Sequence, residues 1–170
     1  MSHILPDVLE SGLSVVFCGT AASKVSAEMG VYYAHSNNLF WKILHEAGFT
    51  PRRLPPHEYS TVKQFGIGLT DLVKDDFGGD SEIRSCTESD RDALRSKILE
   101  TRPGFVAFTS KTAGRRYFRK TIELGEQAQF IGSTRVFVLP STSLKARWQW
   151  PETAHHWRLF ASAVQCARGI

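Results

Sequence analysis

Short apolar runs alternate with longer segments of helical periodicity along this chain, and this alternation restricts the folds open to it. The runs at 13–18, 105–108 and 136–139 are almost entirely apolar, as expected of strands buried on both faces. A fourth run, 65–73, alternates glycine with apolar residues. Because amphipathic segments separate these runs, the sequence predicts a parallel sheet of four strands with helices on both faces.

Helical periodicity and capping residues indicate four helices. Apolar residues recur at helical spacing ahead of Gly48, with Ser36 as the expected N-cap and Gly48 as the stop. Thr87 begins a capping-box pattern followed by a second apolar stripe. Two further helices are expected at 113–124 and 154–167.

The composition fits one globular domain. Of 170 residues, 42% are hydrophobic and 22% are charged, which excludes disordered, collagen-like and coiled-coil chains. Residues 1–170 are therefore expected to form a single α/β domain, with three layers, α/β/α, around a central, mostly parallel, four-stranded sheet. The formal charge of +4 permits a polyanionic partner without requiring one.

Two absences indicate the compartment. The three cysteines, Cys18, Cys86 and Cys166, have no paired spacing, which argues against a disulfide framework and a structural metal site. The first ten residues lack the basic and apolar stretches of a signal peptide, and no apolar run is long enough to span a membrane. We therefore expect a soluble intracellular protein, cytoplasmic or nucleoid-associated.

Small polar residues gather where the predicted strands end. They occur at 19–26, 70–71, 109–111 and 140–145. The carboxyl ends of parallel strands share one edge of a sheet, where ligands bind in this class of fold. The segments 19–30 and 74–86 lack periodicity and are expected to be loops.

Four motifs in these segments resemble those of a known family. The sequence FCGTAAS at 17–23, with GVYYAHSNNLFWK at 30–42, is similar to the opening motif of the mismatch-specific uracil- and thymine-DNA glycosylases, in the uracil-DNA glycosylase superfamily. The similarity continues in GIGLTDLV at 66–73, in the lysine after the third strand and in LPSTS at 139–143. Four motifs in the right order, each at a predicted strand end, make the resemblance specific.

The resemblance implies a DNA repair enzyme. Such enzymes flip uracil, with other deaminated bases as further candidates, out of DNA and hydrolyse its bond to the sugar, leaving an abasic site. It implies a monomeric glycosylase without metal or organic cofactor, whose partner is DNA containing uracil or an abasic site. We expect a monofunctional enzyme, because a lyase needs an amine nucleophile in the pocket, and the only lysines near by motif placement, Lys111 and Lys145, are not in segments that look desolvated. The resemblance also implies that Tyr33 stacks on the flipped base. The base-binding set expected from the motif is Gly19, Thr20, Ala21, Ser23, Ser26, Tyr33 and Asn38.

One departure from the family pattern concerns catalysis. The family's opening motif reads G-I-N-P-G, and its asparagine holds the attacking water, whereas this chain has Ala21 there. A methyl group cannot hold a water, so either another residue takes the role or the chemistry relies on stabilising the departing base and the cationic sugar. Candidate replacements are Asp71, Glu28, His35 and Ser23, and we favour Asp71 because a carboxylate suits both a nucleophilic water and a cationic sugar.

Two further roles are expected. His35, next to the stacking ring, is a catalytic candidate that hydrogen-bonds the leaving base or a flanking phosphate. The segment 140–147 resembles the family's loop that enters the duplex and grips the backbone. The wedge is one of Leu144, Lys145 and Arg147, with the register left open. The DNA-binding set is Lys111, Ser141, Thr142, Ser143, Leu144, Lys145 and Arg147.

Two other hypotheses compete with the glycosylase. In the first, favoured by Ala21, the fold has lost its water-positioning residue and only binds flipped bases or abasic sites. In the second, the chain is an unrelated small α/β ligand-binding enzyme, which requires all four motif matches to be accidental.

Overall fold

The structure is a computed structural model that describes residues 3–143 and 149–169. Its centre is a five-stranded sheet in the order β2-β1-β3-β5-β4. The four strands expected from the apolar runs are parallel neighbours, and every residue of β1 is buried. The strands are β1 Val15–Gly19, β2 Ile67–Asp71, β3 Phe105–Phe108, β4 Gly125–Glu126 and β5 Arg135–Val138.

The prediction of four strands was wrong by one. The additional strand, β4, has two residues and pairs antiparallel with the end of β5, so the sheet is mixed rather than wholly parallel. Two residues are too short for a detectable alternation of apolar and polar side chains. Glu126 also forms an ion pair with Arg135 of β5, with 2.7 Å between Oε2 and Nε.

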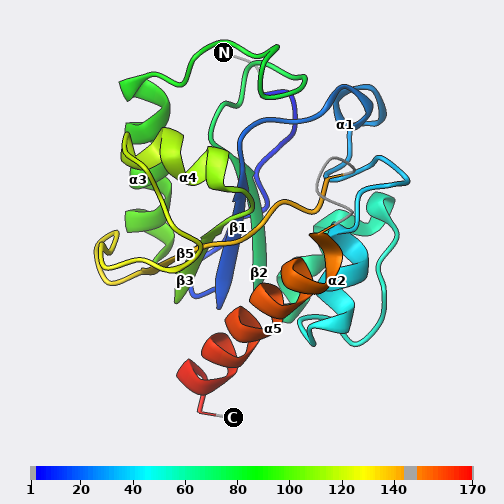
Figure 1. The fold of residues 1–170 in the computed structure, drawn as a ribbon, viewed down its shortest axis with the longest axis vertical. Helices are drawn as coiled ribbons and strands as arrows, with labels where there is room; N and C mark the ends of the chain where they lie inside the picture. The colour runs from blue at the N-terminus through cyan, green and yellow to red at the C-terminus, as the bar shows by residue number, and fades with distance from the viewer. Residues whose placement is uncertain (1–2, 144–148, 170) are drawn as a thin grey trace.

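Helices cover both faces of the sheet, as predicted, in three layers (Figure 1). The aromatic side chains of α2 and α5 pack on one face around Phe17. The apolar residues of α3 and α4 pack on the other face around Val16 and Phe108. The helices are α1 Lys24–Met29, α2 Phe40–Glu46, the 3-10 segment η1 Pro56–Phe65, α3 Glu88–Thr101, α4 Lys111–Phe118 and α5 Trp150–Ala167.

The observed helix boundaries show which local sequence signals determine where a helix begins and ends. The capping box at the start of α3 is present, with the Thr87 side chain accepting from Asp90 N and the Asp90 side chain accepting from Thr87 N. The expectation that Ser36 caps α2 was wrong, because α2 begins at Phe40 and Asn38 Oδ1 accepts the Phe40 N–H at 2.9 Å instead. The expectation of a helix to residue 124 was also wrong, since α4 ends where Arg119 turns left-handed at φ 61°.

Two helical segments were not predicted. The short helix α1 lies in the segment expected to be a loop, capped by the Ser23 hydroxyl, which accepts the Ser26 N–H at 3.1 Å. The segment η1 follows the prolines after α2, and Pro56 occupies its first turn. Proline suits that position because its missing N–H would have no partner there.

Candidate functional site

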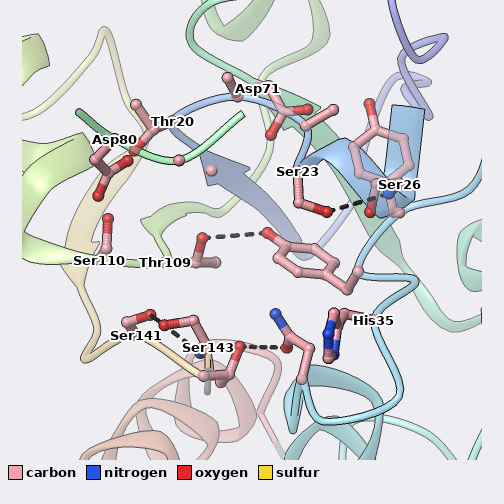
Figure 2. A pocket seen from close by; sticks show the side chains of 18 of the residues that line it. Thr20, Ser23, Ser26, His35, Asp71, Asp80, Thr109, Ser110, Ser141 and Ser143 are labelled. Carbon is pink, nitrogen blue, oxygen red and sulfur yellow. Dashed lines mark hydrogen bonds between the residues drawn. The ribbon is translucent and has the colours of Figure 1, made fainter. Parts of the chain in front are cut away.

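A cavity of about 380 Å³ opens at the carboxyl ends of β1, β2, β3 and β5. This is the edge of the sheet where the small polar residues were expected to meet. Figure 2 shows Asp71 and Ser23 on one side of the cavity, Ser141 and Ser143 on the other, and Thr109 between them. The volume is in the range of sites that enclose a small ligand.

Twelve of the predicted site residues line this cavity. Lys111 is exposed at the start of α4 and is not among the lining residues. Glu28, on α1, also lies outside the lining set. Leu144, Lys145 and Arg147 fall outside the described residues. The twelve are Gly19, Thr20, Ala21, Ser23, Ser26, Tyr33, His35, Asn38, Asp71, Ser141, Thr142 and Ser143.

The loop that contains Ala21 is held by the chain that continues β2. Leu72 N donates to Gly19 O at 2.9 Å, and Val73 N donates to Thr20 O at 2.8 Å. Gly78 N then donates to Ala22 O at 2.9 Å. The parallel pairing of β1 and β2 therefore extends past the strand ends, and it fixes the loop against the segment that begins with Asp71.

Asp71 is the carboxylate brought to this loop. It is the last residue of β2, pairs with Gly19 and is 7% exposed. A methyl group on Gly19 would lie 2.8 Å from Asp71 Oδ1, so this position needs glycine for the close approach of the carboxylate. Within the described part of the chain, no group donates a hydrogen bond to the Asp71 side chain. Its oxygens are therefore available to a water or a ligand.

Burial raises the pKa of Asp71 to about 6, against the opposing attraction of the Lys74 ammonium. The nearby Asp7 carboxylate raises it further, and Lys97 lowers it. A carboxyl with this pKa is mostly ionised at neutral pH and still accepts a proton readily. These are the properties of a general base.

Charged residues behind the cavity form a network that the sequence did not indicate. Asp7 Oδ1 lies 2.8 Å from Lys74 Nζ, and Asp7 Oδ2 lies 2.7 Å from Lys97 Nζ. Thr70 donates to the same carboxylate at 2.6 Å, and Lys74 donates to the Tyr32 hydroxyl at 3.1 Å. The Lys74 amine is thus committed to neighbours rather than free to act as a nucleophile.

Tyr33 is held rigidly at the cavity. Its backbone is left-handed, with φ 51°, a conformation that costs a tyrosine energy and is found mainly where surrounding contacts enforce it. Its ring stacks on Phe40, with 3.8 Å between the centroids and 10° between the planes, and its hydroxyl shares a hydrogen bond with Thr109 Oγ1 at 3.1 Å. Burial raises the pKa of this hydroxyl, so it remains neutral.

Asn38 presents its amide group to the cavity. Its Oδ1 accepts hydrogen bonds from Phe40 N and from Thr142 Oγ1, each at 2.9 Å. The amide is therefore oriented by two partners on different elements. Among the described residues none accepts a bond from Nδ2, which leaves its N–H groups for a ligand.

The side chains of Ser23, Ser26 and His35, which line the cavity, form different hydrogen bonds with the backbone. Ser23 caps α1, and Ser26 Oγ accepts the N–H of Ala34, the residue after Tyr33, at 3.1 Å, so both hydroxyl oxygens stabilise the backbone. His35 is exposed, and its Nδ1 accepts the Asn37 N–H at 3.0 Å. That bond leaves Nε2 as the donor of a neutral imidazole.

Several lining residues were missed. Thr109 and Ser110 follow β3, and Asp80 belongs to the segment expected to be a surface loop. Gly78 and Gly79 reach the cavity because Ala22 forms a bridge to Phe77. The only sequence signal for Thr109 and Ser110 was their position at a strand end. No sequence signal indicated Asp80, because a long-range contact places it at the cavity.

No group of three or more His, Cys, Asp or Glu gathers to hold a metal ion within residues 3–143 and 149–169. Over the same ranges, no helix is long and apolar enough to cross a membrane. The lining combines the rings of Tyr32, Tyr33 and His35, the carboxylates of Asp71 and Asp80, the amide of Asn38 and several hydroxyls. These groups suit a flat polar ligand, which an aromatic ring can stack on and an amide can hydrogen-bond at its edge.

The fold and the cavity define a three-layer α/β domain that holds a small ligand where its parallel strands end. The chain belongs to the uracil DNA glycosylase superfamily, whose family model matches residues 6–163. It is also similar to the solution NMR structure of a putative uracil DNA glycosylase from Methanosarcina acetivorans. That match has a TM-score of 0.66 and 20% sequence identity, and it covers 95% of this chain and 96% of the other.

Proposed function

We propose that this protein is a monofunctional uracil-DNA glycosylase that flips uracil out of DNA and hydrolyses its N-glycosidic bond. The superfamily is one of N-glycosylase hydrolases, which supports the reaction class. The observation that carries the proposal is the buried carboxylate of Asp71, which has no hydrogen-bond donor among the described residues and lies beside the loop in which Ala21 replaces the family's asparagine. The motif resemblance favours the mismatch-specific branch of the superfamily.

In this mechanism Asp71 holds and deprotonates the attacking water. The water oxygen bonds to C1′ of the sugar, and the bond between C1′ and N1 of uracil breaks. Uracil leaves with the bonding electron pair, and the water proton passes to the Asp71 carboxylate. Before the transfer, the negative charge of Asp71 also stabilises the cationic character of the sugar.

The other lining residues bind and orient the flipped nucleotide. The Tyr33 ring, supported from behind by Phe40, stacks on the base. Asn38 Nδ2 donates to the base edge, and its fixed orientation favours a carbonyl oxygen there. Ser141 Oγ donates to Ser143 Oγ at 3.0 Å, which leaves the Ser143 hydroxyl to donate to a phosphate oxygen. The proposal is for a monofunctional enzyme, which is supported by the commitment of the Lys74 amine to Asp7 and Tyr32; Lys145 lies outside the described residues.

A uracil-containing oligonucleotide, incubated with the protein and then with alkali, tests the function. The wild type should yield strand cleavage at the uracil, because alkali breaks the chain at an abasic site. An otherwise identical oligonucleotide with thymine is the control for base excision. Strand cleavage without alkali would contradict the monofunctional mechanism.

One observation favours a second candidate, a module that binds flipped bases or abasic sites without cleavage. Ala21 removes the side chain that positions water in the family pattern. The same experiment separates the two functions. Retarded migration of the oligonucleotide without alkali-sensitive cleavage would support the binding module and refute the enzyme.

A further inference from the structure

A second cavity, of about 480 Å³, lies beside the first. Its walls combine the thioether of Met29, the rings of Pro55 and Pro56 and the buried Trp41 and Leu54. Met29 is 61% exposed, so its side chain is open to solvent at the edge of this cavity. The cavity therefore offers apolar contact surface to something outside the domain.

The two cavities share a wall. Tyr33, His35 and Asn38 line both of them, so one short segment of chain separates the spaces. This segment contains the left-handed turn at Tyr33 that sets the stacking ring. When a nucleotide of a DNA strand occupies the first cavity, the adjacent nucleotides of that strand therefore lie near the second cavity.

Charge at the second cavity also points to nucleic acid. Arg53 lines it and is exposed, and the described residues offer this guanidinium no carboxylate partner. The adjacent Arg52 does not line the cavity and is paired with Glu58, with 2.7 Å between Nη2 and Oε1. Of two consecutive arginines, the one at the cavity is thus the one left to bind an anion. His57 adds a hydrogen-bonding side chain to the same lining.

We propose that the second cavity binds the unpaired nucleotide next to the flipped one on the same strand. Its base packs against Met29 and the prolines, and its phosphate lies against Arg53. Apolar and aromatic surfaces bind any base through its flat face, whereas a phosphate needs a cation, and both requirements are met here. The inference rests on the proposed function, because the first nucleotide must be in the first cavity.

Binding to a non-cleavable analogue tests the inference separately from catalysis. Single-stranded oligonucleotides carry one 2′-fluorinated deoxyuridine, whose glycosidic bond resists cleavage. In one of them the 5′ neighbour lacks its base, in another the 3′ neighbour does, and a third is intact. We expect the wild type to bind one of the baseless oligonucleotides about tenfold more weakly than the intact one, the scale of a lost base-stacking contact.

Variants then connect this loss to the cavity. Met29→Ala should weaken binding of the intact oligonucleotide severalfold. It should have no effect on the oligonucleotide whose missing neighbouring base already weakens binding, because the contact between that base and Met29 is absent there. Arg53→Ala should weaken binding and reduce its salt dependence, whereas Arg52→Ala, the matched control, should change neither. Both Met29 and Arg53 are exposed, so neither change removes core packing.

The outcomes are distinguishable. The inference would be overturned if the wild type bound all three oligonucleotides with the same affinity. It would also be overturned if Met29→Ala weakened the binding of every oligonucleotide equally. Arg53→Ala behaving as Arg52→Ala would overturn the phosphate contact. Specific binding with these sensitivities but no excision of ordinary uracil would sustain the second cavity and refute the proposed enzyme.

Discussion

Replacing Asp71 by asparagine should make the protein more stable at neutral pH while slowing its uracil excision. The folded chain holds this carboxyl at a pKa of about 6, against an ordinary value of 3.8, and burial is the main cause. One pKa unit corresponds to about 1.4 kcal/mol, so keeping Asp71 ionised costs the folded state about 3 kcal/mol at pH 8. Asparagine has nearly the same shape and carries no charge.

The sign and the pH window follow from the raised pKa. The unfolded chain ionises Asp71 more easily than the folded chain, so the wild type loses stability as the pH rises through about 4 to 6. The variant lacks this loss. The stability advantage of Asp71→Asn should therefore be largest above pH 6 and should shrink to under about 1 kcal/mol near pH 4, where Asp71 is protonated in the folded chain and only partly ionised in the unfolded chain.

Urea unfolding of the wild type and Asp71→Asn, at about pH 8 and about pH 4, measures this difference. Comparing the two proteins cancels the titration of every other carboxyl. Asp80→Asn, which removes an exposed carboxylate from the same cavity, is the control. An Asp71→Asn variant that is destabilised more at pH 8 than at pH 4 would refute the reasoning, because it would mean that the ionised carboxylate has a stabilising partner in the folded state.

Two further changes test the binding surface and the loop. Tyr33→Ala should lower single-turnover uracil excision at least about tenfold, because a stacked base is worth about 1–3 kcal/mol, while Tyr33→Phe keeps the ring and should retain most of the activity. Equal rates for Tyr33→Ala and the wild type in folded protein would exclude the stacking role. Ala21→Asn should leave uracil excision measurable in the same assay, since the family's asparagine occupies that position; complete loss would mean that the loop is built around the smaller side chain.

The sequence predicted those strands and helices that depend on interactions between residues close together in the chain. The strands β1 and β3 are fully buried, β5 is buried and apolar after its first residue, and α3 begins at a capping box formed within four residues. The two-residue strand β4 exists only through its pairing with β5, which no local pattern reveals. The helix α1 consists of six residues among small side chains, too few to display a periodicity.

The site could be predicted where it follows strand ends and could not where it depends on contacts across the chain. Tyr33, Asn38 and Asp71 were predicted from motifs, and all three line the cavity. The pairing of Asp7 with Lys74 joins residues far apart in sequence, and the approach of Asp80 depends on the bridge between Ala22 and Phe77. The raised pKa of Asp71 likewise depends on burial, which the sequence does not specify.

The most direct test of Asp71 as the base is the pH dependence of single-turnover uracil excision at saturating enzyme. Since the ionised carboxylate is the active form, the wild-type rate should rise with pH and level off above a pKa of about 6. Asp71→Asn should be slower by about 10²-fold or more, without this pH dependence, while its affinity for abasic DNA is unchanged. A wild-type rate that does not vary around pH 6, or a decrease of less than about threefold in Asp71→Asn, would contradict the role of Asp71 as the base.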